Sequence, residues 1–420
     1  MLVQFSVANF RSIAEQQTFS LVASADQHLR QGHVEENAGG KGLPALLHSA
    51  VLYGPNAAGK SSLVRALDFV DDFVMGSLAR KSGQKIPVQA HAFDKALRNA
   101  PSEFELTFIL DGVRYQFGFS VTEDRVDSEW LYAYPEGRPQ RWIDRKGDDR
   151  SNWYINPALK GSKKTWIEST REDALILSTA VQLNSTALKP VHDWFKDKLR
   201  VASRGAMFTG YTVEQINKHN KKSDVLEFLA AADLGISSID LKSGKFEADA
   251  LPKDMPTELR EFFSKRMENE EFTEVFIDHD TESGNTARFT LEEESDGTQK
   301  MFGMAGALLD VLRNGRVLVV DEFDTSLHPV LVRHLLNLFH DRRTNVSGAQ
   351  LIFTTHDTSL LNAQEMRRDQ IWFAEKDKEY QTHLYPLTDF SPRRTESLER
   401  GYLQGRYGAL PFLGSLELSA

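Results

Sequence analysis

Alternation of apolar and polar side chains marks strands in the first third of the chain. Asp111-Gly112, a pair typical of tight hairpins, separates two of the alternating runs. The predicted strands cover residues 2–10, 18–22, 102–110, 113–121, 130–134 and 141–143. We predict that residues 102–110 and 113–121, extended by 130–134 and 141–143, form an antiparallel sheet lobe, and that residues 18–22 pair with residues 2–10. Residues 27–44 lack this pattern and are rich in Gly, His, Asn and Glu, which indicates a surface loop.

Short, mainly apolar runs without alternation mark a second kind of strand, which is buried on both faces as in a parallel sheet. These runs are residues 49–53, 316–320 and 350–355. Helical spacing is found in residues 61–78, 171–263 and 301–312, and strand character returns in residues 275–279 and 287–291. No heptad pattern persists for three or four repeats, so we expect a modest helical insertion and no long coiled coil.

Composition narrows the class of protein. The 420 residues, 40% hydrophobic and 26% charged, suit one large or two medium globular domains. The absence of cysteine excludes disulfides and thiolate sites. No run approaches the roughly 20 apolar residues of a membrane helix, and residues 1–5 do not resemble a signal peptide, so we expect a cytoplasmic protein without a membrane partner. The formal net charge of -10 leaves nucleic-acid binding open but does not favour it.

Residues 52–62 have the pattern of a phosphate-binding loop between a buried strand and a helix. In G-x-x-x-x-G-K-[ST], glycines let backbone N–H groups curl around nucleotide phosphates, and the helix directs its positive dipole end at them. Lys60 reaches the β- and γ-phosphates, and Ser61 binds Mg²⁺. The residues expected to hold the nucleotide are Gly54, Asn56, Ala57, Ala58, Gly59, Lys60, Ser61 and Ser62.

Two further apolar runs end in side chains suited to hydrolysis. Residues 316–320 lead into Asp321, which can hold Mg²⁺ through water, and Glu322, which is placed to orient and deprotonate the attacking water. The run from residue 350 leads into His356, which is placed to sense or stabilise the γ-phosphate. The carboxyl ends of parallel strands share one edge of a sheet, so we predict that these side chains lie at the phosphate-binding loop.

A Ser-x-Gly-x-Gln turn, with Ser295, Gly297 and Gln299, precedes the helix predicted at residues 301–312. Such a helix start offers backbone N–H groups and a hydroxyl to an anion. Because the chain has its own phosphate loop, we interpret this turn as closing the nucleotide site of another subunit. The alternative is an ordinary helix N-cap by Ser295.

Arg11 lies in Asn-Phe-Arg-Ser, between the first two predicted strands. An arginine there is often only a turn residue. A strand edge beside the phosphate-binding loop would instead bring Arg11 to the phosphates or the ribose, so both interpretations stay open.

The order of these motifs resembles the ATP-binding-cassette heads of the SMC, Rad50 and RecF group. Residues 9–12 look like their opening turn, residues 324–329 look like their D-loop, and the insertion stands where they have a coiled coil. Within the group the chain is similar to anti-phage ATPases: RloA and AbiL-type ATP-binding proteins, the ATPase half of overcoming-lysogenization-defect nucleases, and the PARIS ATPase component. The similarity extends to residues 401–412.

The resemblance implies an α/β ABC-ATPase head: a P-loop core with an antiparallel β lobe. It assigns residues 1–125 to the N-terminal part of the head, 126–270 to a mixed, then helical insertion, and 271–420 to the C-terminal part. ATP and Mg²⁺ are the implied cofactors, and Lys60, Glu322 and His356 the implied catalytic residues. Arg11 would contact the nucleotide. The Q-loop glutamine is not fixed, and Gln89 is the nearest candidate.

The resemblance further implies a homodimer or larger homo-oligomer, with ATP between heads and Ser295, Gly297 and Gln299 acting in trans. The implied function is that of a sensor or regulator that controls a separately encoded effector, a toxic nuclease, and responds to a phage-encoded trigger. About 60 residues follow His356 in this sequence, fewer than a nuclease domain of ordinary size, so we expect the chain not to cut nucleic acid itself. The alternative is a DNA-binding repair or recombination ATPase of the RecF or SMC kind.

Overall fold

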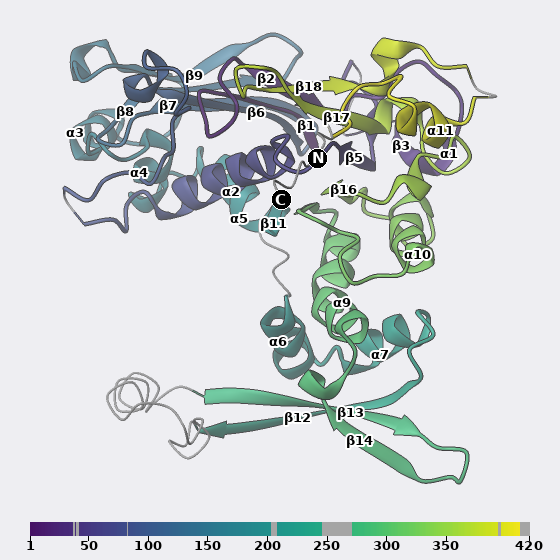
Figure 1. Ribbon diagram of the computed structural model, residues 1–420. Coiled ribbons are helices and arrows are strands. Elements are labelled where there is room, and N and C mark those ends of the chain that lie inside the picture. Colours follow the sequence, from purple (N-terminus) through teal and green to yellow (C-terminus); the bar gives the residue numbers. More distant parts are fainter. Residues whose placement is uncertain are drawn as a thin grey trace, which may run out of the picture. The chain divides into compact units, whose positions relative to one another are not determined.

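The computed structural model describes residues 1–36, 38, 42–81, 83–202, 208–245, 271–393 and 396–411 (Figure 1). The chain divides into two compact units. The first comprises Met1–Ala206, Val311–Thr325 and Val332–Ala420, and the second Met207–Asp310 and Ser326–Leu331. Two predicted stretches extend beyond the described residues. Residues 246–263 of the predicted helical stretch 171–263 lie outside them, and so does Phe412 of the stretch 401–412.

A six-stranded sheet forms the centre of the first unit, in the order β11-β15-β16-β5-β17-β18. Its strands are β11 (Leu199–Ala202), β15 (Val317–Val320), β16 (Gln350–Thr354), β5 (Ser49–Tyr53), β17 (Ile371–Lys376) and β18 (Thr382–Pro386). All neighbouring pairs are parallel except β17 and β18. The three predicted apolar runs are the adjacent strands β15, β16 and β5, and every residue in them is buried. Their apolar side chains on both faces explain why they occupy the middle of the sheet.

A seven-stranded antiparallel sheet forms the β lobe, in the order β10-β9-β8-β7-β6-β1-β2. Its strands are β10 (Tyr154–Ile155), β9 (Gln140–Lys146), β8 (Val126–Tyr134), β7 (Val113–Val121), β6 (Ser102–Leu110), β1 (Leu2–Ala8) and β2 (Gln17–Ser20). The hairpin at Asp111-Gly112 has the predicted register, with Leu110 opposite Val113. Asp111 and Gly112 both have positive φ, as a tight hairpin turn requires.

Helix α2 (Lys60–Gly76) follows the phosphate-binding loop and runs along the antiparallel sheet (Figure 1). Its buried residues join both sheets in one hydrophobic core. The other helices of this unit are α1 (Arg30–His33), α3 (Lys163–Ser169), α4 (Ile176–Gln182), α5 (Lys189–Lys198) and α11 (Leu398–Leu403). Short 3-10 turns occur at Leu97–Asn99, Arg150–Asn152, Thr358–Leu360, Arg368–Gln370 and Leu387–Phe390. Strands β3 (Val34–Glu35) and β4 (Leu46–Leu47) form a small ribbon.

The second unit contains a three-stranded antiparallel sheet and helices. Its elements are α6 (Thr209–His219), α7 (Lys222–Ala230), β12 (Ile236–Lys245), β13 (Glu271–Asp280), β14 (Thr286–Thr290), the 3-10 turn Leu291–Glu293 and most of α9 (Asp296–Asn314). The boundary between the units falls within α9 and within α10 (Pro329–His340). Helix α6 approaches α9 closely because α9 has a glycine there: the Gly306 N–H donates to Thr212 Oγ1 (3.0 Å). No helix in the described ranges has the length and apolarity to cross a membrane.

Two strands interrupt the stretch that the periodicity predicted as helical. Strand β11 follows α5 directly and continues its apolar spacing, but it pairs in parallel with β15. Strand β12 pairs with β13. In both cases partners distant in sequence override the local pattern, as tertiary contacts commonly do.

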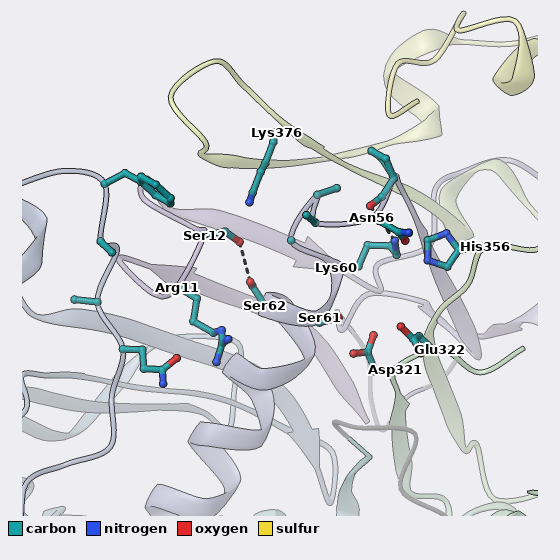
Figure 2. A pocket seen from close by; sticks show the side chains of 18 residues that line it. Arg11, Ser12, Asn56, Lys60, Ser61, Ser62, Asp321, Glu322, His356 and Lys376 are labelled. Carbon is teal, nitrogen blue, oxygen red and sulfur yellow. Dashed lines mark hydrogen bonds between the residues drawn. The ribbon is translucent and has the colours of Figure 1, made fainter. Parts of the chain in front are cut away.

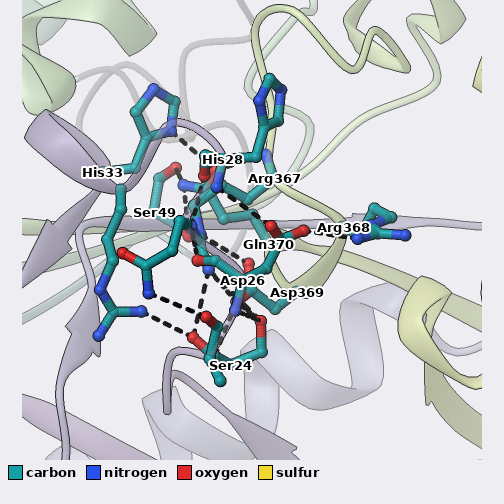
Figure 3. A network of polar contacts seen from close by, with 12 residues as sticks. Ser24, Asp26, His28, His33, Ser49, Arg367, Arg368, Asp369 and Gln370 are labelled. Atoms are coloured by element: carbon teal, nitrogen blue, oxygen red, sulfur yellow. Dashed lines mark hydrogen bonds and ion pairs between the residues drawn. The ribbon is translucent and has the colours of Figure 1, made fainter. Parts of the chain in front are cut away.

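The prediction of a surface loop at residues 27–44 is wrong for its first part, which is held by a buried polar network (Figure 3). Gly32, His33 and Val34 are buried. His33 Nδ1 bonds to Gln370 Oε1 (2.9 Å), and Gln370 Nε2 donates to Ser49 Oγ (2.8 Å). These partners come from distant parts of the chain, so the polar composition of the segment did not reveal them.

Candidate nucleotide-binding site

A cavity of ≈ 550 Å³ lies where the central strands of the first unit end (Figure 2). Its volume is within the range of about 300–1,000 Å³ that small-ligand sites occupy. Lining residues come from the loop after β5, from the ends of β15, β16 and β17, and from the turn after β1. They include Arg11, Ser12, Asn56, Ala57, Ala58, Gly59, Lys60, Ser61, Ser62, Gln89, Phe93, Asp321, Glu322, His356 and Lys376. The structure thus brings most of the predicted site residues around one cavity.

The loop between β5 and α2 has the conformation that its glycines allow. Gly54, Ala57 and Gly59 have φ of 154°, 65° and 103°. A Cβ at Gly59 would overlap the Thr382 hydroxyl, and a Cβ at Gly54 would overlap the carbonyl oxygen of Ala374. These two glycines are therefore required both by conformation and by close packing, and they leave the loop curled at the start of α2.

Lys60, the first residue of α2, turns back over the loop. Its side chain is only 6% exposed, and Nζ donates to the carbonyl oxygens of Gly54 (2.7 Å) and Pro55 (3.2 Å). Burial lowers the pKa of Lys60 to about 8, while Asp321 and Glu322 oppose this shift. A bound anion would stabilise the ammonium form, so this lysine is suited to holding phosphate.

The two acidic residues that follow β15 are both held by one hydroxyl from β16, Asp321 through its carboxylate and Glu322 through its backbone N–H. Thr354 Oγ1 donates to Asp321 Oδ1 (2.7 Å) and accepts the Glu322 N–H (2.8 Å). Asp321 is 6% exposed, and Thr354 is 1% exposed. Glu322 has a φ of 54°, a left-handed conformation that is uncommon outside glycine. The turn after β15 therefore fixes the backbone at the position proposed to carry the catalytic base.

His356 lies two residues after β16 and lines the same cavity. Its backbone N–H donates to Asp324 Oδ2 (3.3 Å). Burial, and next the positive charge of Lys60, lower the pKa of His356 below its ordinary value. The imidazole is therefore neutral at pH 7, which leaves one ring nitrogen as donor and the other as acceptor.

Arg11 lies on the cavity wall, away from Glu322 and His356 (Figure 2). It has a φ of 55°, and its backbone N–H donates to the Gln89 carbonyl oxygen (2.8 Å). The structure thus shows Arg11 both in a turn and at the cavity. Gln89, the nearest Q-loop candidate, also lines the cavity.

The sequence reasoning missed a hydroxyl chain beneath the loop. Thr382 Oγ1 donates to the Ala58 carbonyl oxygen (2.9 Å) and lies 2.8 Å from Ser12 Oγ. Ser12 Oγ is also 2.8 Å from Ser62 Oγ. These bonds join the first turn, the loop and β18. Lys376 was missed as well, although its place at the end of an apolar strand was a usable signal.

Ser295, Gly297 and Gln299 lie in the second unit, at the start of α9. The Thr298 N–H donates to Ser295 Oγ (3.2 Å), which is N-cap geometry. Gln299 Nε2 donates to the Glu294 carbonyl oxygen (2.8 Å). The helix cap is therefore present, and it does not conflict with a role of the same turn toward another subunit.

Comparison with protein families identifies the class. Residues 49–362 match the model of a family described as "AAA domain, putative AbiEii toxin, Type IV TA system". The chain belongs to this AAA family. The match begins with β5, the strand before the phosphate-binding loop, and ends beyond His356. No curated protein gives a significant match.

Solved structures resemble this AAA protein at low sequence identity. One is the SMC head domain from Thermotoga maritima: 12% identity, 92% of this chain and 98% of that chain covered, TM-score 0.42. Another is an SMC head bound to the C-terminal winged-helix domain of ScpA: 14% identity, 96% and 99% covered, TM-score 0.41. A third is the recombination mediator RecF with ATPrS: 13% identity, 91% and 98% covered, TM-score 0.35.

The donor set of the AAA site fits a nucleotide with a hard cation. Asp321 places a carboxylate, and Ser61 a hydroxyl, on the cavity wall. Carboxylate and hydroxyl oxygens suit Mg²⁺, which also keeps waters and phosphate oxygens as ligands. Arg11, Lys60 and Lys376 supply positive charge along the same wall, although the whole chain is acidic.

Proposed function

We propose that this AAA protein hydrolyses ATP and uses the reaction as a switch. One observation carries the proposal: the phosphate-binding loop, Asp321, Glu322 and His356 line the same cavity. A loop that holds phosphates, oxygen ligands for a cation and a carboxylate base are the parts that phosphoryl transfer to water requires.

Each residue has a distinct proposed role. Loop N–H groups and Lys60 hold the phosphates, while Ser61 and Asp321 hold Mg²⁺, which neutralises charge on the phosphates when it is bound. Glu322 orients the attacking water and accepts its proton. The neutral imidazole of His356 donates a hydrogen bond toward the γ-phosphate as negative charge develops there.

Replacement of Glu322 by glutamine tests the hydrolytic role. Glu322→Gln should retain ATP binding and hydrolyse ATP roughly 10²–10⁴-fold more slowly, because the general base is removed while its shape is kept. Glu136→Gln is the matched control, since Glu136 is exposed in the turn between β8 and β9. Turnover equal to that of the unaltered protein in Glu322→Gln would refute the assignment.

The proposed switch is a dimer in which ATP lies between two heads. Ser295, Gly297 and Gln299 of one subunit would contact the phosphates held by the other subunit. ATP in that position adds affinity between the subunits only in the closed dimer. Hydrolysis removes this affinity, so the subunits separate. Accumulation of dimer by Glu322→Gln in the presence of ATP is the expected result.

We propose further that the switch controls a separately encoded effector, a toxic nuclease, in anti-phage defence, with a phage-encoded trigger. The family description, which refers to a putative toxin and a type IV TA system, supports a role in a toxin system, while the separate effector and the trigger come from the resemblance to anti-phage ATPases. The net charge of -10 also favours a protein partner over nucleic acid.

Purification of Glu322→Gln with its genomic neighbours and ATP tests this role. A stable assembly that carries a second, toxic gene product would support it, and native mass would give the stoichiometry. A bare dimer that binds duplex DNA with a steep salt dependence would instead support the repair or recombination alternative.

A further inference from the structure

Two exposed aromatic rings stack on each other, and one of them lines the cavity. Phe93 is 63% exposed and Tyr380 is 58% exposed, yet their rings are stacked on each other, with centroids 5.1 Å apart and planes at 22°. Phe93 is one of the residues that line the cavity. A large ring that remains this exposed beside a ligand cavity still has apolar area to bury against a ligand.

The pair is held in place from both sides. On the Phe93 side, His91 is buried. Its backbone N–H donates to Asn9 Oδ1 (3.0 Å), and its ring Nδ1 bonds to the carbonyl oxygen of Arg11 (2.9 Å). The backbone two residues before Phe93 is thereby tied to the turn after β1.

On the other side, Tyr380 lies in the hairpin between β17 and β18. The hairpin is tied to the same turn, because the Thr382 N–H donates to the Ser12 carbonyl oxygen (2.8 Å). Thr382 also reaches the phosphate-binding loop at the Ala58 carbonyl oxygen (2.9 Å). Both rings are therefore fixed to the elements that build the nucleotide site.

We propose that Phe93, supported by Tyr380, is the stacking platform for the base of the bound nucleotide. This inference rests on the proposed function, which places the phosphates at the loop. A nucleoside triphosphate is longer than its phosphates, and Arg11, Gln89 and Phe93 line the same cavity as the loop. Every base has a ring face, so stacking selects for a base without identifying it. We expect ATP and GTP to be accepted alike.

Binding of AMPPNP and of inorganic tripolyphosphate, both with Mg²⁺, tests the platform by calorimetry. Phe93→Ala should weaken AMPPNP binding about 5- to 150-fold, the range measured for base stacking on aromatic side chains. It should leave tripolyphosphate binding unchanged, because that ligand has no base. Phe93→Trp should bind AMPPNP at least as well as the unaltered protein, and Tyr380→Ala should show a smaller loss.

Phe390→Ala is the matched control: it removes another partly exposed phenylalanine of the first unit that does not line the cavity. Unchanged AMPPNP affinity in Phe93→Ala, or an equal loss for both ligands, would overturn the platform and leave the proposed function standing. If the unaltered protein binds neither ligand, or Lys60→Ala weakens neither, the proposed function fails and the platform fails with it.

Discussion

Thr354 offers a direct test of how the catalytic end of the site is built. Its hydroxyl uses its one proton on Asp321 Oδ1 (2.7 Å) and accepts the Glu322 N–H (2.8 Å). Thr354→Val keeps the branched shape and removes both bonds. The variant therefore changes polar contacts to the two carboxylate residues while the packing between β15 and β16 is preserved.

The magnitude follows from the kind of bond lost. A hydrogen bond to a charged group contributes about 1.5–3 kcal/mol, and a neutral one about 0.5–1.5 kcal/mol. Thr354→Val should thus lower the free energy of unfolding by roughly 2–4.5 kcal/mol, a large part of the about 5–15 kcal/mol available to a domain. Thr355→Val is the matched control: Thr355 is also buried, but within the described part of the chain its hydroxyl accepts only the Asp357 N–H, at 2.9 Å. We expect it to cost about 1 kcal/mol.

Urea unfolding and steady-state ATP hydrolysis of both variants separate stability from positioning. Thr354→Val should lower kcat by about 10- to 100-fold, as expected when a catalytic group is displaced, with a smaller effect on KM. Thr355→Val should keep kcat, and Thr354→Ser should restore it. If the two valine variants match in both stability and kcat, the bridging hydroxyl does not position the carboxylates.

Two further predictions concern pH. Because burial lowers the pKa of Lys60 to about 8 and a bound triphosphate would raise it, ATP binding takes up a proton above pH 8. ATP affinity measured by calorimetry should then fall by up to about tenfold per pH unit between pH 8 and 9.5, and a flat profile would contradict this. Burial lowers the pKa of His33 to about 4. The neutral His33 therefore contributes fully to the free energy of unfolding above pH 6.5, and this contribution is lost as the pH falls toward 4. His33 alone should account for a loss of at most about 3 kcal/mol in the free energy of unfolding by urea, and the loss should be smaller in His33→Asn.

Local patterns predicted the parts of the fold that depend on local physics. The strand, loop and helix around Lys60 follow from an apolar run, two glycines and helical spacing, and the hairpin follows from Asp111-Gly112. Strand β11 was missed because its four residues, three of them apolar, directly follow a helix and look like more helix. Only β15, more than a hundred residues later, provides the backbone groups that make it a strand.

The same distinction applies within the site. Side chains at the ends of parallel strands could be placed together, because such ends share one edge of a sheet. This brought Asp321, Glu322 and His356 to the phosphate-binding loop. Thr354 and Phe93 carried no comparable signal. A threonine in a strand and a phenylalanine in a connecting segment are ordinary residues until their partners are known.

Thr354 and Thr382, which the sequence did not single out, share a physical role: each positions residues whose chemistry the sequence did predict. Lys60 and Glu322 have chemistry that is evident from residue type, but chemistry of this kind requires position. Thr354 supplies position to the carboxylates, and Thr382 supplies it to the loop through the Ala58 carbonyl oxygen. Both act through one hydroxyl placed between two chain segments. Loss of either should therefore impair the site while leaving every catalytic side chain in the sequence, and a scan restricted to recognisable motifs would overlook it.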